Sequence, residues 1–147
     1  MIGILAEYDA LTGLSQIAGS KTRKELVADG NGHGCGHNLL GAGSMAAAFA
    51  IKKYLEEKGE GSGKVILYGC PGEEGAATKA FMARDGVFAE CDAALTWHPG
   101  NVNQVTSGTC NTCIQTEYKF TGVASHAAGA PDKGRSALDA VELMNIG

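Results

Sequence analysis

The chain has 147 residues, which is the length of about one domain. Glycine supplies 22 of them, roughly twice the usual ~7%, but the glycines are spread among apolar runs, which excludes a collagen-like or disordered chain. With 12 basic and 16 acidic residues the formal net charge is −4. A nucleic-acid partner, which a protein holds through clustered Lys and Arg, is therefore not expected.

The sequence has no sign of a membrane or secretory destination. Its apolar runs are shorter than the ~20 residues that cross a bilayer, and its first residues lack the basic segment and cleavage site of a signal peptide. The cysteines are odd in number and scattered, which argues against a disulfide framework. They are Cys35, Cys70, Cys91, Cys110 and Cys113. We expect a cytoplasmic protein with no membrane partner.

Short, continuous apolar runs predict strands that are buried on both faces. They cover residues 2–6, 65–68 and 92–97. Between the first two runs, apolar residues recur at helical spacing, which predicts a helix with an N-cap at Asn38 and a stop within residues 59–63. Strands that alternate with helices are typical of an α/β domain with a mostly parallel sheet.

Weaker patterns fill the rest of this region. The glycine- and serine-rich loop at residues 12–38 contains a charged, weakly helical piece, Lys21–Val27. A second helix is expected at about residues 76–84. Small residues in the main helix, such as Gly41 and Gly43, would allow it to approach the sheet closely.

The pattern changes after His98. Residues 100–112 are polar, residues 114–120 alternate apolar and polar as in a strand with one wet face, and residues 135–144 predict an amphipathic helix. The change predicts a domain boundary near residue 107.

The boundary gives a first domain at residues 1–106 and a second at residues 107–147. The second is too short to be stable alone.

Residues that commonly bind metals lie beside the predicted strands and at the start of the main helix. They are Glu7, Asp9, Cys35, His37, Glu73, Glu74 and His98. Because ligands of open α/β sheets collect at the carboxyl ends of strands, we expect these side chains at one edge. Thiolate, imidazole and carboxylate together suit zinc, or manganese where oxygen ligands dominate.

The adjacent pair Glu73-Glu74 is the most informative of these features. Two successive side chains cannot easily bind the same ion, so one can hold a metal while the other stays free. A free carboxylate beside a metal is what a hydrolase needs as a general base.

Each residue alone also has an ordinary structural explanation. A Glu-Glu pair is commonly a solvated surface, a single histidine is commonly a structural residue, and a cysteine such as Cys35 is commonly a small buried hydrophobe. Cys110 and Cys113 have zinc-ribbon spacing, but no second pair accompanies them, so we interpret that spacing as incidental. The ordered set, rather than any one member, indicates a metal centre.

Six short motifs run along the chain. They are EYDAL at residues 7–11, GHGCGHN at 32–38, PGEEG at 71–75, WHP at 97–99, GVASHAA at 122–128 and GRSALDA at 134–140. Together they resemble the amidohydrolase branch of the aminoacylase/carboxypeptidase metallopeptidase family, over essentially the whole chain. The resemblance implies part of a three-layer, zinc-exopeptidase-like α/β domain with a mostly parallel sheet, followed by the start of an inserted α+β, ferredoxin-like lid that commonly forms homodimers.

The resemblance also implies roles for individual residues. The metal ligands, for one or two zinc or manganese ions, are Cys35, His37, Glu74 and His98. Glu73 would be the general base, Asp9 would orient the site from behind the ligands, and His126 of the lid would help to stabilise the oxyanion. Family members are longer, with strands before residue 1 and a further histidine ligand after residue 147, so we expect a fragment that is inactive alone.

The function that the resemblance implies is metal-dependent hydrolysis of the amide bond in N-acyl amino acids, such as aminobenzoyl-glutamate, or in small dipeptides, by metal-activated water with a glutamate base. One alternative is a catalytically inactive, truncated remnant that only binds metal. A thiol enzyme that uses Cys35 with His37 is a weaker alternative, because a two-residue spacing rarely lets an imidazole deprotonate the neighbouring thiol.

Overall fold

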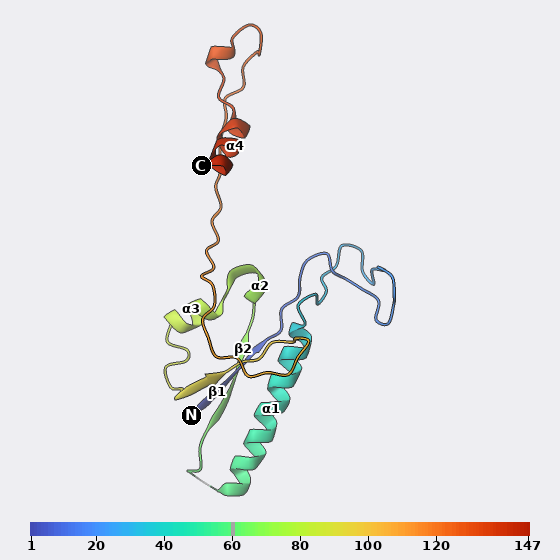
Figure 1. Ribbon diagram of the computed structural model, residues 1–147, viewed down its shortest axis with the longest axis vertical. Helices are drawn as coiled ribbons and strands as arrows, with labels where there is room; N and C mark the ends of the chain where they lie inside the picture. Colours follow the sequence, from blue (N-terminus) through green and yellow to red (C-terminus); the bar gives the residue numbers. More distant parts are fainter. Residues whose placement is uncertain (60) are drawn as a thin grey trace. The chain divides into compact units, whose positions relative to one another are not determined.

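The computed structural model describes residues 1–59 and 61–147 (Figure 1). The chain divides into two compact units, Met1–Asn111 and Thr112–Gly147. Among the described residues, no helix is both long and apolar enough to span a membrane.

The first unit is a mixed α/β structure built on a three-stranded sheet (Figure 1). Its strands are β1 (Ile2–Glu7), β2 (Val65–Cys70) and β3 (Ala93–Leu95). Their order is β2-β1-β3, and both neighbours pair with β1 in parallel, so Ile2 lies opposite Val65 on one side and opposite Ala93 on the other. All three predicted strands are therefore confirmed, with β3 shorter than expected.

The main helix, α1 (His37–Lys58), packs against β1 and β2. It begins one residue before the expected N-cap, so the assignment of Asn38 as N-cap is wrong. The N-cap is Gly36, whose φ of 88° is a left-handed conformation that favours glycine and turns the chain directly into the helix. The helix ends at Gly59, within the predicted stop at 59–63, of which residue 60 lies outside the described residues.

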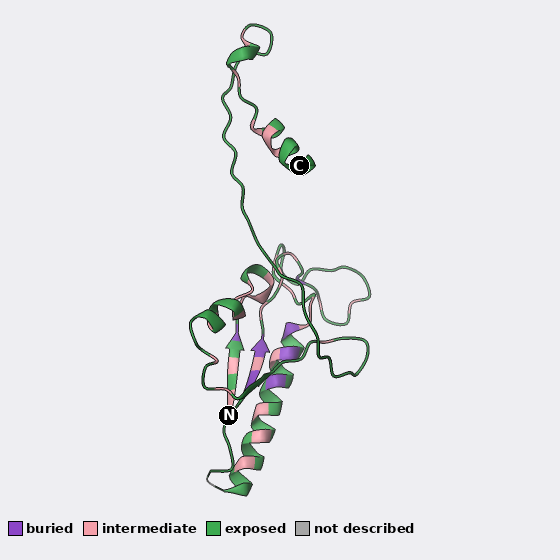
Figure 2. Cartoon of the chain, turned by 60° about the vertical axis from the view of Figure 1, so that its left-hand side comes forward, coloured by how far each residue is buried: buried purple, intermediate pink, exposed green. Residues whose placement is uncertain are grey.

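Small residues bring α1 close to the strands, as the sequence predicted. A Cβ atom on Gly41 would lie 3.0 Å from the carbonyl oxygen of Glu7, and one on Gly43 would lie 2.8 Å from the ring of Trp97. Ser44 donates a hydrogen bond to the carbonyl oxygen of Leu5 at 3.1 Å. Buried residues accordingly gather in β1 and in the first turns of α1 (Figure 2).

In the first unit, the weak helical prediction within the loop is wrong, and the helix expected at residues 76–84 is confirmed only in part. Lys21–Val27 forms no helix, because Gln16 and Ile17 use its backbone groups: the Lys24 N–H donates to the side chain of Gln16, and the Lys24 carbonyl accepts from the N–H of Ile17. The helix expected at residues 76–84 is two short helices, α2 (Glu73–Ala76) and α3 (Lys79–Arg84). They are separated because Ala77 has a φ of 47°, outside the right-handed helical region.

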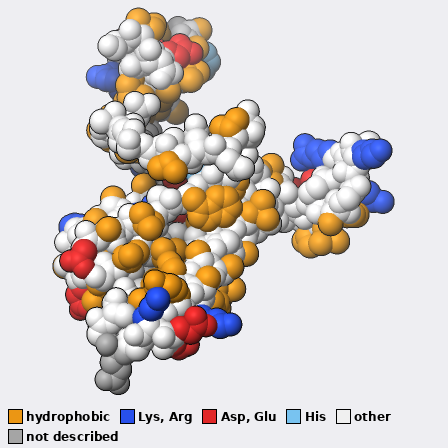
Figure 3. Space-filling model, turned by 60° about the horizontal axis from the view of Figure 1, so that its bottom comes forward, with side chains coloured by type: hydrophobic (Ala, Val, Ile, Leu, Met, Phe, Trp, Pro, Cys, Tyr) orange, Lys and Arg blue, Asp and Glu red, His pale blue; other side chains and the backbone are white. Residues whose placement is uncertain are grey.

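Apolar side chains remain exposed on the first unit (Figure 3). A groove of about 190 Å³ runs between α1 and β2 and is lined by Met45, Ala48, Phe49, Lys52, Val65 and Leu67. Within the described residues β2 is an edge strand of the sheet, so this apolar groove lies beside strand backbone that pairs on one side only.

The second unit contains a short 3₁₀ turn, η1 (Pro131–Lys133), and the helix α4 (Ala137–Ile146). Ser136 is the N-cap of α4, and its hydroxyl accepts a hydrogen bond from the N–H of Asp139 at 3.1 Å. The predicted C-terminal helix is confirmed, with a start two residues later. The predicted strand at residues 114–120 is wrong, because within the described residues that segment has no neighbouring strand to pair with.

Candidate metal centre

The carboxyl ends of the strands carry the candidate ligands of the first unit. Glu7 is the last residue of β1 and Asp9 follows it, Glu73 and Glu74 open α2 directly after β2, and His98 follows β3. Cys35 and His37 lie at the start of α1, which packs on the same strands. Parallel pairing of the three strands places these chain segments at one edge of the sheet.

His37 is the centre of this group and is 1% exposed. Its Nδ1 lies 2.9 Å from Oδ1 of Asp9, and the second oxygen of Asp9 accepts a hydrogen bond from the backbone N–H of Glu74 at 3.0 Å. Burial, the largest single influence, raises the pKa of Asp9, but these two hydrogen bonds, together with the backbone N–H of Asp9 itself and the electrostatic effect of His37, hold the pKa below its usual value. An ionised carboxylate only accepts, so Nδ1 of His37 carries a proton and a neutral ring presents the lone pair of Nε2.

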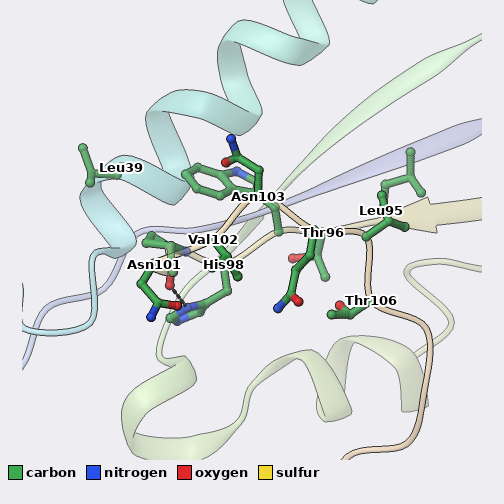
Figure 4. A pocket seen from close by; sticks show the side chains of 13 residues that line it. Leu39, Leu95, Thr96, His98, Asn101, Val102, Asn103 and Thr106 are labelled. Carbon is green, nitrogen blue, oxygen red and sulfur yellow. Dashed lines mark hydrogen bonds between the residues drawn. The ribbon is translucent and has the colours of Figure 1, made fainter.

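His98, which follows β3, is likewise fixed by a hydrogen bond at its Nδ1. Its Nδ1 lies 3.0 Å from the carbonyl oxygen of Pro99, which can only accept a hydrogen bond, so the lone pair of the neutral ring again lies on Nε2 (Figure 4). That Nε2 lies 3.1 Å from Sγ of Cys35. Two histidines fixed through Nδ1, with Nε2 directed at other donor atoms, are typical of metal-binding imidazoles.

The two carboxylates of α2 approach His37 from opposite sides of its ring. Oε2 of Glu73 lies 3.9 Å from Nε2 of His37, whereas Oε1 of Glu74 lies 4.0 Å from Nδ1. Glu73 is 38% exposed at its side chain and Glu74 is 22% exposed. The more exposed Glu73 is accessible to a water or substrate, whereas Glu74 is tied through its backbone to Asp9.

A second carboxylate faces Nε2 of His37 from β1. The buried Glu7 places Oε2 3.0 Å from Nε2, and its Oε1 forms an ion pair with Nζ of Lys79 at the start of α3. The sequence pattern placed Glu7 among the possible ligands but not in the final set, and it did not single out Lys79. No local pattern marks Lys79, because its contact is with a strand that is 72 residues away in the sequence.

The arrangement fits a bound cation. Within the described residues, Nε2 of His37 and Oε1 of Glu74 are buried side-chain atoms without a hydrogen-bond partner, and leaving buried polar atoms unpaired costs about 1–3 kcal/mol each. Two sets of donor atoms each lie within 4.8 Å of one another: Cys35, His37 and His98, and Glu7, His37 and Glu73. Thiolate, imidazole and carboxylate donors of this kind suit zinc, and manganese where oxygen dominates.

The environment of Cys35 argues against a free thiol nucleophile. Burial raises the pKa of its thiol, and the carboxylates of Glu74, Glu73 and Glu7 raise it further. Reactive cysteines are held as thiolates by positive surroundings, and this cysteine has negative ones. A nearby cation would reverse that balance.

His126 lies in the second unit. Its Nδ1 accepts hydrogen bonds from the backbone N–H groups of Ala128 and Gly129, at 3.2 and 2.9 Å. The neutral ring therefore carries its proton on Nε2, and the side chain is exposed. His126 thus offers a hydrogen-bond donor of fixed orientation.

A cavity of about 910 Å³ adjoins His98 (Figure 4). Leu39 lines it from α1, and the rest of the lining is the stretch from the end of β3 through residue 106. The lining is mixed, with the apolar side chains of Leu95, Trp97 and Val102 beside the amide of Asn103. A cavity of this size beside candidate metal ligands could accept one part of a small organic substrate.

A parallel α/β sheet with a thiolate, imidazole and carboxylate cluster at its carboxyl edge is typical of a metallohydrolase. The chain belongs to the Peptidase family M20/M25/M40, whose model matches residues 3–142. This family membership agrees with the resemblance carried by the sequence motifs.

Three curated relatives are similar to the chain. It is 54% identical to one of the subunits of p-aminobenzoyl-glutamate hydrolase from Escherichia coli (strain K12), a match that covers 100% of this chain and 30% of that protein. It is 33% identical to Xaa-Arg dipeptidase of Homo sapiens, over 97% of this chain and 29% of that protein. It is also 33% identical to indole-3-acetyl-aspartic acid hydrolase of Enterobacter agglomerans, over 72% of this chain and 25% of that protein.

The chain therefore spans less than a third of the length of each of these relatives. No solved structure matches the chain.

Proposed function

We propose that this chain provides most of a divalent-metal centre for hydrolysing the amide bond of N-acyl amino acids or dipeptides. The ligands would be Cys35, His37, Glu74 and His98. The observation that carries the proposal is a pair of buried side-chain atoms without a hydrogen-bond partner within the described residues, Nε2 of His37 and Oε1 of Glu74. His37 belongs to both groups of possible metal donors, and Oε1 of Glu74 lies 4.0 Å from Nδ1 of the same ring. When bound there, a zinc or manganese ion supplies Lewis-acid activation of a water molecule.

The chain's own residues would divide the remaining work. Glu73, which is more exposed than Glu74 and has no backbone tie to Asp9, would accept the proton of the attacking water and pass it to the leaving nitrogen. Asp9 would keep His37 in one tautomer and fix the start of α2. His126, with its proton on Nε2, would donate to the developing oxyanion.

The relatives and the cavity beside His98 support the proposed substrate class. The named substrates of the three relatives, p-aminobenzoyl-glutamate, an Xaa-Arg dipeptide and indole-3-acetyl-aspartate, are amides of an amino acid. Two of the three carry an aromatic acyl group. The apolar side of the cavity, with Trp97 and Val102, would take that group.

We further propose that residues 107–147 begin a lid that forms homodimers. Leu138, Leu143 and Ile146 of α4 are each more than 60% exposed, so this helix presents apolar side chains that a partner surface would cover. Size-exclusion chromatography with light scattering measures the oligomeric state directly. A dimer that Leu143→Glu dissociates supports this proposal, and a monomer at micromolar concentration contradicts it.

The two glutamates of α2 provide the test of the catalytic proposal. In a full-length enzyme that contains this chain, Glu73→Gln should bind metal as the unmodified enzyme does but lose about 10²–10⁴-fold in turnover of p-aminobenzoyl-glutamate, because only the base is removed. Glu74→Gln should lose metal affinity, and Glu57→Gln, at an exposed position of α1, should change neither. Loss of metal affinity in Glu73→Gln and loss of turnover alone in Glu74→Gln would show that Glu73 is the ligand and Glu74 the base. Metal binding without turnover by that full-length enzyme would favour an inactive protein that only binds metal.

A further inference from the structure

The end of β1 holds a buried carboxylate that the proposed ligand set does not use. The side chain of Glu7 is 9% exposed, and each of its two carboxylate oxygens faces a specific nitrogen atom. Oε1 pairs with Nζ of Lys79, and Oε2 lies 3.0 Å from Nε2 of His37. A buried charge without partners is strongly unfavourable, so the position of Glu7 requires an explanation.

The contact between Glu7 and His37 is not a satisfied hydrogen bond. Because Nδ1 of His37 is held by Asp9, a neutral His37 ring presents a lone pair at Nε2. The carboxylate oxygen of Glu7 presents lone pairs as well, so two acceptors face each other at 3.0 Å. Within the described residues, Nε2 of His37 has no hydrogen-bond partner. Two acceptor atoms at this distance repel each other, and the arrangement becomes favourable when a cation lies between them.

Lys79 explains why only one oxygen of Glu7 faces the histidine. Four carboxylates lie within 4.0 Å of the His37 ring nitrogens, those of Glu7, Asp9, Glu73 and Glu74. In the described part of the chain, Lys79 is the one Lys or Arg that pairs with any of the four. The Lys79 side chain is 27% exposed, and its ammonium group neutralises Oε1 of Glu7 and leaves Oε2 directed at Nε2 of His37.

We propose that Glu7 is a further oxygen ligand of the cation held by His37, and that Lys79 is the positioning residue that aims it. The inference rests on the proposed function in one respect, the use of Nε2 of His37 as a metal ligand. It adds an oxygen donor from β1 to the ligand set, on the Nε2 side of His37, where Glu73 also lies but stays free as the proposed base. A carboxylate donor in this set would favour metals that accept oxygen, such as manganese.

The experiment is a cobalt titration of the chain, with visible absorption to report coordination and competition by a chelating dye to report affinity. Glu7→Gln should weaken Co²⁺ binding by at least ~10–100-fold, the range found when groups behind a ligand are removed. It should also change the ligand-field spectrum, because a donor atom is exchanged. Lys79→Met should weaken binding without exchanging a donor, and Lys79→Arg should restore binding because it keeps the charge. Lys52→Met removes an exposed lysine that pairs with Glu56 and serves as the control.

A double variant separates a ligand from a structural ion pair. Glu7→Gln combined with Lys79→Met leaves no unpaired buried charge, so a purely structural pair predicts that the wild-type Co²⁺ affinity returns. The proposal predicts that binding stays weak, with non-additive effects of the two changes. Wild-type affinity and spectrum in Glu7→Gln, or recovery in the double variant, would overturn the inference alone. Failure of the unmodified chain to bind Co²⁺ would overturn the proposed function together with it.

Discussion

Asp9 and Glu74, 65 residues apart, are joined by a hydrogen bond from the backbone N–H of Glu74 to Oδ2 of Asp9 at 3.0 Å. The other oxygen of Asp9 lies 2.9 Å from Nδ1 of His37. One carboxylate thus ties the end of β1 to the first turns of α1 and α2, the helices that carry two of the proposed ligands. We therefore expect Asp9 to help hold these two ligands in place.

Asp9→Asn should weaken metal binding by about 10–100-fold. An asparagine side chain has one acceptor oxygen, so its NH₂ group must face either the proton on His37 or the N–H of Glu74. The affinity for Zn²⁺, measured by competition with a chelating dye, checks this expectation. Asp85→Asn, which alters an exposed pair with Arg84, is the matched control. Equal affinities in the two variants would show that Asp9 does not organise the site.

The lowered pKa of Asp9 gives a pH dependence with a definite sign. Because the folded-state pKa lies below the usual value of 3.8, the ionised form stabilises the metal-free fold. The advantage of wild type over Asp9→Asn in free energy of unfolding should be fully present above the unfolded-state pKa. It should disappear as the pH falls through the lower folded-state pKa. Urea unfolding of both proteins between about pH 6 and pH 2 measures the difference. A difference that grows on acidification would contradict the assignment.

Gly43→Ala tests the close approach of α1 to the chain after β3. The added Cβ would lie 2.8 Å from the ring of Trp97, so the ring must shift. Such overpacking costs about 1–3 kcal/mol, and the better helix propensity of alanine returns at most ~1 kcal/mol. We expect a net loss of about 1–2 kcal/mol in the free energy of unfolding. Gly75→Ala, where a Cβ meets nothing within 4 Å, should not be destabilised. Equal stabilities for the two variants would count against this packing.

The sequence predicted the layout of the first unit because its strands are continuous apolar runs. Such runs form strands in order to bury both faces, so their positions can be read without knowledge of distant contacts. The same reasoning predicted which chain segments meet at the carboxyl edge. It was wrong about Lys21–Val27, whose backbone groups are taken by Gln16 and Ile17, and about Asn38, which the left-handed turn at Gly36 places inside α1. Neither a hydrogen bond within a loop nor a left-handed turn at one glycine leaves a mark in the spacing of apolar residues.

The candidate site could also be predicted from the sequence only in part. Spacing and the strand ends suggested Cys35, His37 and the Glu73-Glu74 pair, since each lies beside a predicted element. The ion pair between Glu7 and Lys79 was not predictable, because it depends on where α3 begins after the break at Ala77. Which nitrogen of His98 is directed at Cys35 also depends on one contact, the carbonyl oxygen of Pro99.

The most direct test of the metal centre is the absorption of the cobalt-loaded chain in the near ultraviolet, where a thiolate bound to Co²⁺ gives a charge-transfer band. The wild-type chain should show this band. Cys35→Ser should abolish it, and Cys110→Ser, which changes an exposed cysteine, should keep it. A band that survives Cys35→Ser, or a wild-type chain that binds Co²⁺ without the band, would contradict the assignment of Cys35 as a metal ligand.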